Sequence, residues 1–342
     1  MQKVTLGKTG ITVNKNGFGA LPIQRITKDE AAFLLRKAFD NGITYFDTAR
    51  FYTDSEEKLG YALSDIRDKV IIATKTGATT AEGFWKDLET SLSLLKTDFI
   101  DLYQFHNPAF CPKPNDGTGL YEAMLEAKRQ GKVLHIGITN HRLEVARESI
   151  ASGLYETLQF PFSYLASDKD LEIVQQCKDA GMGFICMKAL SGGLITDSAT
   201  AYAFLNQYEH VLPIWGIQKE KELDEFISYQ ECAPTLTEER LDKIRKDREE
   251  LSGDFCRGCG YCLPCPAGIY IPDCARMSLY LRRAPLSVYL GDEYKQKMEK
   301  VKDCLHCGQC KRKCPYGLDT PSLLQKNYED FLTFLYIIIM AS

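Results

Sequence analysis

Four ionisable side chains follow closely on three consecutive apolar runs of strand-like sequence. They are Asp47, Tyr52, Lys75 and His106. Because the carboxyl ends of parallel strands converge on one face of a barrel, we expect these side chains to meet there. A carboxylate at the edge of a buried strand is costly unless it is paired, so Asp47 predicts a cationic partner in Lys75.

These four groups suit the reduction of a carbonyl group by a hydride. A phenol has a reference pKa of about 10, and a neighbouring ammonium favours its ionised form. Tyr52 beside Lys75 is therefore expected to donate a proton to the substrate oxygen, while Asp47 holds Lys75 and His106 orients that oxygen. Taken singly, such residues are more often structural ion pairs or packing. Their joint placement favours catalysis.

Cysteines form the second chemical signal. Nine of the thirteen lie between Cys256 and Cys314. The run Cys304-x2-Cys307-x2-Cys310-x3-Cys314-Pro has the spacing of bacterial ferredoxins, and Cys256-x2-Cys259-x2-Cys262-x2-Cys265-Pro has a last gap that is one residue shorter. Two zinc sites are the alternative that the shortened gap leaves open.

The cross-ligation rule of these motifs divides the eight cysteines into two sets. One set is Cys256, Cys259, Cys262 and Cys314, and the other is Cys304, Cys307, Cys310 and Cys265. The two motifs resemble a two-cluster ferredoxin domain over residues 253–325, which implies two [4Fe–4S] clusters. Cys274 is left over, and the remaining cysteines are expected to serve packing.

Strand and helix signals alternate along the first two thirds of the chain. A hairpin over residues 4–13 could plug the bottom of a barrel, and Thr27 with Glu30 predicts a capping box at the start of a helix. Helices are expected over 55–63, 81–95 and 120–130, and strands end at Asp47, Lys75 and His106. Further strands are expected at 133–138, 156–160, 183–187 and 211–215. This alternation predicts an α/β fold, the (β/α)8 TIM barrel.

The sequence divides near Cys232-Ala233-Pro234. We expect a barrel domain over 1–232, a helical linker and ferredoxin-like iron–sulfur domain over 233–330, and an apolar tail over 331–342. The tail is about half as long as a membrane span, so packing on the barrel or in a homodimer is expected instead. Residues 1–15 contain no apolar run of signal-peptide length, which favours a cytoplasmic location. A net charge of −4 argues against a nucleic-acid partner.

Residues 3 to about 232 resemble the aldo-keto reductase family. The resemblance rests on Asp47-Thr48-Ala49 with Tyr52 and Ser55-Glu56, on Thr74-Lys75, and on His106. It implies that Asp47, Tyr52, Lys75 and His106 are the catalytic tetrad. It also implies an extended nicotinamide cofactor whose carboxamide contacts Thr139, Asn140 and Gln159.

The resemblance assigns the rest of the cofactor site with two departures from the family pattern. Met187 replaces an aromatic residue that stacks on nicotinamide, and it is followed by Lys188, Leu190, Ser191, Gly192 and Gly193, which are expected near the pyrophosphate. After the eighth strand, Gly216, Gln218 and Lys219 are expected to contact the cofactor. Lys219 and Lys221 could bind a 2′-phosphate, although Glu220 stands between them, so NADP(H) is favoured and NAD(H) is the alternative.

Three functions follow from these features. The first is an NAD(P)H-dependent oxidoreductase that interconverts a carbonyl and an alcohol (an aldehyde, ketone or sugar substrate), with clusters that are structural or carry electrons. The second is an electron-transfer reductase that exchanges electrons with a ferredoxin or a flavoprotein. The third is a non-catalytic redox-sensing module, against which the intact set of four ionisable groups argues.

Overall fold

The computed structural model describes residues 2–251, 255–283 and 286–341 and divides into two compact units. The barrel unit comprises Met1–Ala189 and Ala199–Leu241, and the cysteine unit comprises Leu190–Ser198 and Asp242–Ser342. The boundary predicted at residue 232 therefore lies nine residues before the division at Leu241. The grouping of Leu190–Ser198 with the second unit was not predicted from the sequence.

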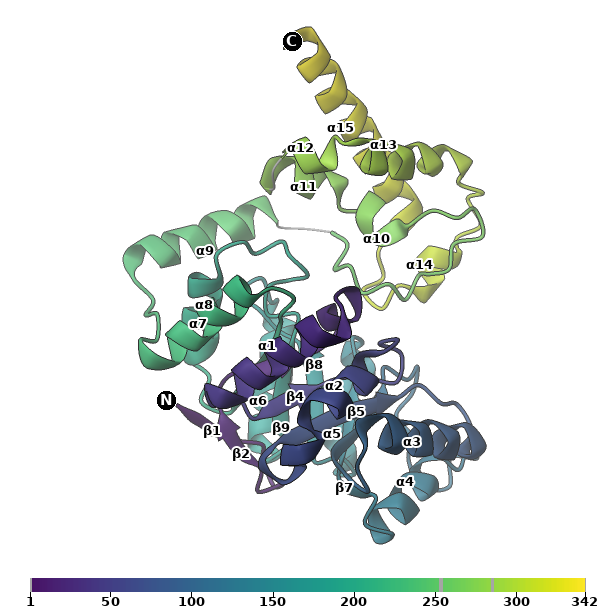
Figure 1. Cartoon of the computed structure of the whole chain (residues 1–342). Coiled ribbons are helices and arrows are strands. Elements are labelled where there is room, and N and C mark those ends of the chain that lie inside the picture. The colour runs from purple at the N-terminus through teal and green to yellow at the C-terminus, as the bar shows by residue number, and fades with distance from the viewer. Residues whose placement is uncertain (1, 252–254, 284–285, 342) are drawn as a thin grey trace. The chain divides into compact units, whose positions relative to one another are not determined.

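The barrel unit is built on eight parallel strands that close in the order β10-β3-β4-β5-β6-β7-β8-β9 (Figure 1). The strands are β3 (Gly17–Gly19), β4 (Tyr45–Asp47), β5 (Ile71–Thr76), β6 (Ile100–His106), β7 (Val133–Thr139), β8 (Thr157–Pro161), β9 (Gly183–Met187) and β10 (Val211–Gly216). The predicted (β/α)8 barrel is confirmed. The strand register brings the tetrad strands together, because Asp47 pairs with Ala73, Lys75 with Gln104 and His106 with Thr139.

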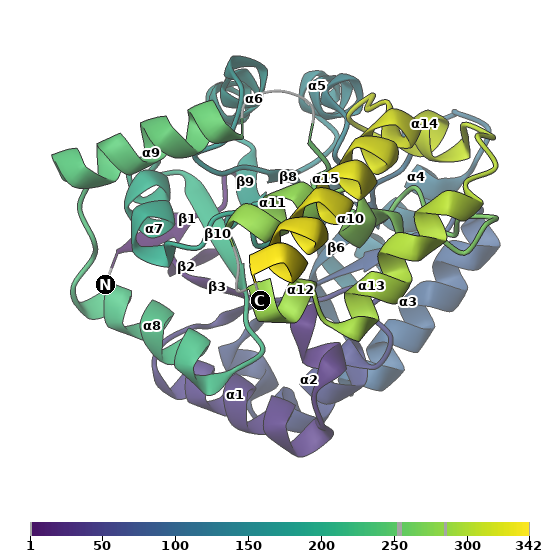
Figure 2. The same cartoon turned by 90° about the horizontal axis from the view of Figure 1, so that it is seen from above.

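Eight helices surround these strands, as the view from above shows (Figure 2). They are α1 (Lys28–Asp40), α2 (Ser55–Leu63), α3 (Ala81–Leu95), α4 (Leu120–Arg129), α5 (Leu143–Ser152), α6 (Asp168–Asp179), α7 (Ser198–Asn206) and α8 (Glu220–Glu231). The capping box at α1 is confirmed, since Thr27 and Glu30 bond each other's backbone N–H groups. Such a cap satisfies two amide donors that the first helical turn leaves without partners.

An N-terminal hairpin fills one end of the barrel. Its strands β1 (Lys3–Thr5) and β2 (Thr12–Asn14) pair antiparallel, with Val4 opposite Val13. Val4, Leu6, Ile11 and Val13 form one buried cluster with barrel residues that include Tyr45. This contact confirms the predicted plug and removes the apolar inner ends of the strands from water.

The sequence did not reveal the first barrel strand. β3 consists of Gly-Phe-Gly, and glycine has little intrinsic preference for strands. Glycine is needed because a Cβ at position 17 would lie 2.9 Å from the Ile214 side chain, and one at position 19 would lie 3.0 Å from the Trp215 carbonyl oxygen. Close packing between strands, and not β-propensity, selects these residues.

The cysteine unit is helical. Helix α9 (Glu238–Glu250) carries the chain into it, followed by α10 (Ile271–Cys274), α11 (Met277–Arg283), α12 (Leu286–Tyr289), α13 (Asp292–Glu299), η3 (Lys300–Asp303), α14 (Gln309–Lys313) and α15 (Thr320–Ala341). Ile269, Met277, Met298, Leu324 and Phe331 belong to its buried core. The cysteine motifs lie in the loops before α10 and around α14.

The apolar tail predicted at residues 331–342 is the continuation of α15. Phe331 is buried in the core of the cysteine unit, whereas Tyr336 and Ile337 are exposed. Figure 1 shows the last turns of α15 extending past the other helices of this unit. None of the described helices has the length and apolarity that crossing a membrane requires.

The turn of the hairpin provides a test of the plug. Gly7 has φ +52°, and a Cβ there would lie 2.4 Å from both Gly181 O and Gly183 N. We expect Gly7→Ala to lower the free energy of unfolding by more than about 2 kcal/mol, because backbone strain and overlap add.

Gly10→Ala is the matched control, because Gly10 also has positive φ (+76°) but has no atom within 4 Å of a Cβ. It should cost only about 1 kcal/mol. Urea unfolding followed by tryptophan fluorescence reports on the barrel unit, since the two tryptophans, Trp85 and Trp215, both lie in it. Equal effects of the two substitutions would contradict close packing at Gly7.

Candidate functional site

A buried ion pair lies at the carboxyl ends of β4 and β5. Lys75 Nζ is 2.7 Å from Asp47 Oδ1 and also donates a 2.5 Å hydrogen bond to the Thr48 carbonyl oxygen. Lys75 is 1% exposed and Asp47 2% exposed. Two opposite charges are thus held out of water in direct contact, as the sequence predicted from the position of Asp47.

Burial acts on both members of this pair. Desolvation lowers the pKa of the Lys75 ammonium and raises the pKa of the Asp47 carboxyl, while the attraction between the two groups opposes both shifts. The charged state of each residue therefore depends on the other. An ammonium whose pKa is lowered gives up or shares a proton more readily than a lysine in water.

Tyr52 lies over this ammonium. The distance from Lys75 Nζ to the centroid of the Tyr52 ring is 5.2 Å. The Tyr52 and His106 rings meet edge to face, with centroids 5.8 Å apart and planes at 83°. The structure thus brings together the four residues that the sequence grouped, all of them from the barrel unit.

The turn that carries Tyr52 is braced at both ends. Thr48 Oγ1 and Ser55 Oγ are 2.8 Å apart, and Ser55 also donates to the Ala20 carbonyl oxygen at 3.0 Å. Glu56, which is buried, accepts a 2.6 Å hydrogen bond from Thr74 next to Lys75. These contacts fix the start of α2 against the ends of β4 and β5, and so they limit the movement of Tyr52.

His106 is held as a neutral ring. Burial, followed by the nearby charge of Lys75, lowers its pKa to about 3. Its Nδ1 atom is buried and has no hydrogen-bond partner among the described residues. A neutral imidazole beside a phenol can accept or donate a hydrogen bond to a substrate oxygen without bringing a second positive charge to Lys75.

Two glutamine side chains form a hydrogen-bonded chain that ends on Asp47. Gln159 Nε2 donates to Asp47 Oδ1 at 3.4 Å, and Gln104 Nε2 donates to Gln159 Oε1 at 3.0 Å. The sequence predicted Gln159 as a carboxamide contact but did not single out Gln104. The available signal was position, because Gln104 stands two residues before His106 on β6 and shares its inward face.

The loop after β7 is ordered by the residues expected to contact nicotinamide. Thr139 Oγ1 accepts a hydrogen bond from the Asn107 backbone N–H, and the Asn140 side chain donates to the Pro108 carbonyl oxygen. Asn140 Oδ1 accepts from the backbone N–H groups of His141 and Arg142. The sequence did not single out His141, although it is buried and its pKa lies well below the usual value, through desolvation and then the charge of Lys188.

The start of α8 is already capped by an acid. Glu222 accepts hydrogen bonds from the backbone N–H groups of Gln218 and Lys219, at 2.8 and 3.0 Å. These are the donors with which a helix N-terminus would otherwise bind a phosphate. Lys219 and Gly216 are exposed, while Met187 and Lys188 are partly buried at the end of β9.

Four of the five residues expected near the pyrophosphate belong to the cysteine unit, and Lys188 belongs to the barrel unit. Leu190, Ser191, Gly192 and Gly193 lie in Leu190–Ser198, which groups with that unit. Within it, the Gly192 carbonyl oxygen accepts a 2.5 Å hydrogen bond from the buried Arg276. Ser191, Gly192 and Gly193 all have positive φ, which glycine adopts readily.

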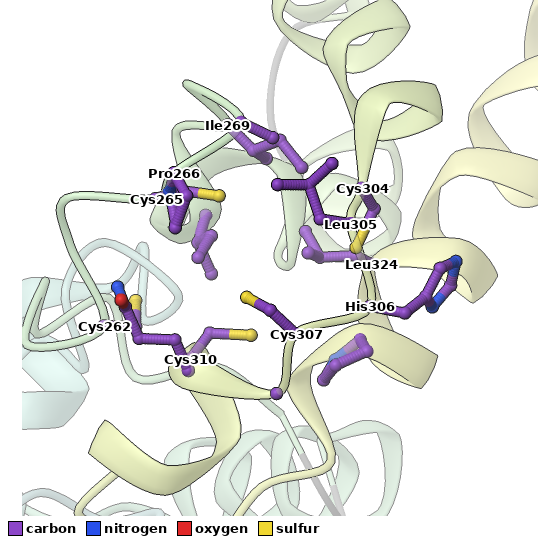
Figure 3. A pocket seen from close by; sticks show the side chains of 15 residues that line it. Cys262, Cys265, Pro266, Ile269, Cys304, Leu305, His306, Cys307, Cys310 and Leu324 are labelled. Carbon is purple, nitrogen blue, oxygen red and sulfur yellow. The ribbon is translucent and has the colours of Figure 1, made fainter.

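The eight motif cysteines line two pockets in the cysteine unit. One pocket is lined by Cys256, Cys259, Cys262 and Cys314. The other is lined by Cys265, Cys304, Cys307 and Cys310, with Cys262 at its edge. Figure 3 shows the labelled sulfurs of the second pocket facing a common space, with the His306 ring turned aside. Both groupings follow the cross-ligation sets proposed from the sequence.

The pockets suit iron–sulfur clusters better than single zinc ions. Among the described residues, no three His, Cys, Asp or Glu side chains converge on a point where one metal ion could sit. Zinc needs its four sulfurs about 2.3 Å from one centre, whereas a cluster spreads its thiolates around a larger body. Burial raises the pKa of the Cys262 thiol to about 12, and a cationic centre of either kind would favour its thiolate.

Comparison with known proteins agrees with this fold and with the iron–sulfur domain. Residues 15–203 match the model of the aldo/keto reductase family, and residues 255–319 match a 4Fe–4S dicluster domain. The chain belongs to the aldo/keto reductase family and carries, in addition, a 4Fe–4S dicluster domain. The resemblances inferred from the tetrad and from the two cysteine runs are confirmed.

Several curated proteins are similar to the barrel part of the chain. It is 30% identical over 211 residues to L-galactose dehydrogenase of Arabidopsis thaliana, covering 56% of this chain and 66% of that protein. It is 31% identical over 224 residues to the aldo-keto reductase YhdN of Bacillus subtilis, covering 58% of this chain and 65% of that protein. The matched part thus spans about two thirds of the length of these relatives.

Among solved structures, the chain resembles the holo form of the aldo-keto reductase AKR11C1 from Bacillus halodurans. The TM-score is 0.62 at 22% identity, over 72% of this chain and 96% of that one. An aldo-keto reductase from Pseudomonas aeruginosa gives a TM-score of 0.60 at 24% identity, over 67% of this chain and 93% of that one. At these identities the likeness concerns the fold.

The ligand sets can be tested by removing the cysteine that each set takes from the other motif. We expect Cys314→Ser to lower the iron content from about eight to about four per chain, because Cys314 completes only one of the two sets. Cys274→Ser is the control. Cys274 is buried and donates to the Lys297 carbonyl oxygen at 3.3 Å, an interaction that serine retains.

Anaerobic purification with iron and sulfide quantified per chain provides the measurement. Full iron content in Cys314→Ser, or an equal loss in both variants, would show that the cross-ligation sets are wrong.

Proposed function

We propose that the chain is an NAD(P)H-dependent oxidoreductase that interconverts a carbonyl and an alcohol. The observation that carries the proposal is the buried contact of Lys75 with Asp47, 2.7 Å long, beneath the ring of Tyr52. It provides a phenol next to an ammonium whose pKa is lowered by burial. Membership of the aldo/keto reductase family supports the same reaction class.

The site has polar atoms to spare for a bound substrate and cofactor. Asp47 Oδ2 and His106 Nδ1 are buried and have no hydrogen-bond partner among the described residues. Buried polar atoms of this kind are costly until a partner reaches them. This observation fits a ligand with hydrogen-bonding groups at the mouth of the barrel.

Each residue then has a distinct role. A nicotinamide, when bound, supplies or accepts the hydride. Tyr52 donates its phenolic proton to the carbonyl oxygen and recovers it in the reverse direction, and Lys75 stabilises the resulting phenolate. Asp47 keeps Lys75 in place, and the neutral His106 hydrogen-bonds the substrate oxygen. Thr139, Asn140, Gln159 and Met187 are proposed to hold the nicotinamide end of the cofactor.

The residues after β10 do not decide whether the cofactor carries the 2′-phosphate that distinguishes NADP(H) from NAD(H). Lys219 is the only basic residue among those proposed after β10, and its backbone N–H is bonded to Glu222. A carboxylate at this position disfavours a second phosphate, since both carry negative charge. NAD(H) is therefore as well supported as NADP(H).

An electron-transfer reductase is the second candidate function. Two pockets lined by cysteines favour it, because a single cluster would be enough for a purely structural role. Hydride transfer moves two electrons together, whereas a [4Fe–4S] cluster passes one. In the first function, the clusters leave turnover unchanged when their reduction is blocked. In the second, cluster reduction depends on cofactor or substrate.

Substitution of the phenol tests the proposed reaction. We expect Tyr52→Phe to lower kcat by about 10²- to 10⁴-fold with little change in cofactor affinity, because the variant loses the proton donor and keeps the ring. The measurement is nicotinamide absorbance during a screen of small aldehydes, ketones and sugars. Tyr61→Phe is the control, since Tyr61 lies exposed on α2. Equal turnover of the two variants would contradict the role of Tyr52.

The charge state of His106 can be measured directly. Because burial lowers its pKa to about 3, the ring should stay neutral in the folded protein between about pH 5 and 8. The unfolded ring takes up a proton near its usual pKa of about 6.5, so this residue makes stability fall as the pH drops from there towards 3.

Nitrogen NMR of the histidine rings would show the state, with His106→Gln identifying the signal. A His106 ring that gains a proton above pH 6 would contradict the assignment of a neutral hydrogen-bonding role.

A further inference from the structure

The two cysteine motifs differ sharply in charge although the first three cysteines of each have the same spacing. Residues 300–319 contain five basic and two acidic side chains, whereas the corresponding residues 252–271, aligned on the first cysteine, contain one of each. The whole chain has a net charge of −4. A local excess of positive charge on an acidic protein needs an explanation of its own, because ligation of a cluster does not require it.

The second cysteine motif, at residues 304–314, also has the more exposed side chains. Of the eight motif cysteines, only Cys307 is exposed. Leu305, between two of the cysteines that line the same pocket, is 66% exposed. His306 beside it is exposed as well. We call Leu305, His306, Cys307, Arg312 and Lys313 the basic edge.

Two cations of this edge have no carboxylate partner in the part of the chain that the structure describes. Lys311 pairs with Asp319 at 3.0 Å. By contrast, neither Arg312 nor Lys313 pairs with a carboxylate among the described residues, and both are exposed. Arg312 Nη1 donates to the Cys307 carbonyl oxygen at 3.0 Å, which holds its guanidinium against the loop that carries the exposed thiol.

We propose that the basic edge is the docking site of an acidic one-electron carrier protein of the ferredoxin type. An exposed leucine on the same loop as a bound guanidinium is typical of a small, transient interface, in which charge steers the approach and a short apolar contact forms the centre. A one-electron carrier is the expected partner, because a [4Fe–4S] cluster exchanges one electron at a time. An acidic surface matches Arg312 and Lys313.

The proposal rests on the binding of a cluster by Cys265, Cys304, Cys307 and Cys310, and it goes beyond the carbonyl chemistry of the barrel. Other occupants are distinguishable. A second copy of this chain would produce self-association, and an acidic flavodoxin would carry flavin in place of iron. Each of these is an outcome of the test below.

The experiment uses the full chain, reconstituted anaerobically, with iron and sulfide quantified before use. The probe is an acidic plant-type [2Fe–2S] ferredoxin, and its binding is followed by biolayer interferometry. We expect the Kd to rise at least about tenfold between 50 and 500 mM salt, because exposed charges are screened over this range. The paired variant Arg312→Glu/Lys313→Glu should weaken binding by about tenfold or more at low salt.

Lys246→Glu is the matched control, because Lys246 is an exposed lysine on α9, outside the motif. It should leave the Kd within about twofold. Iron content equal to that of the unmodified chain is required of every variant, which separates loss of docking from loss of fold.

Four outcomes would overturn the proposal. They are binding that ignores salt, equal losses in the paired variant and Lys246→Glu, tighter binding of an acidic flavodoxin, and salt-sensitive self-association that excludes the ferredoxin. A chain that holds no iron fails at the earlier step, the cluster assignment, and leaves the carbonyl reductase assay of the barrel to be judged separately.

Discussion

The contact between Lys75 and Asp47 is the constraint on which the barrel site depends. Both side chains are almost fully buried, so each would be strongly destabilising alone. Removing one partner from such a pair typically costs about 3–5 kcal/mol, whereas replacing both with apolar residues is often neutral or stabilising. Stability therefore gives no reason for a barrel to keep the pair. The chemistry that we propose for the phenol above it would give such a reason.

The same constraint explains the arrangement around the pair. Asp47 accepts a hydrogen bond from Gln159, which in turn accepts one from Gln104, so the carboxylate has partners besides the ammonium. The neutral His106 adds no further charge next to Lys75. Tyr52 comes from a turn and not from a strand, and the hydrogen bonds of Thr48 and Thr74 to α2 give that turn the fixed position that a strand would otherwise provide.

The sequence predicted best where a local pattern decides the structure. Ser55–Leu63, Ala81–Leu95 and Ile100–His106 match their expected ranges, because apolar periodicity and caps act over a few residues. It failed where distant packing decides. Gly17 and Gly19 are glycines because neighbouring residues leave little room for a Cβ, and Gln104 lies near Asp47 and bonds its partner Gln159. The resemblance to the family identified the tetrad, but only the structure shows that Asp47 and Lys75 are buried.

The tetrad and the motif cysteines lie in different units of the chain. Every residue of the tetrad and its glutamine partners lies in the barrel unit, so the proton transfer that we propose requires no group from the cysteine unit. Within the cysteine unit, Arg276 donates to Gly192 and also packs so close to Gly258 that a Cβ there would lie 2.5 Å from its guanidinium. Gly258 belongs to the Cys256–Cys259 loop. One buried side chain therefore contacts both the segment Leu190–Ser198 and a cluster loop, although Gly192 and Gly258 are 66 residues apart in sequence.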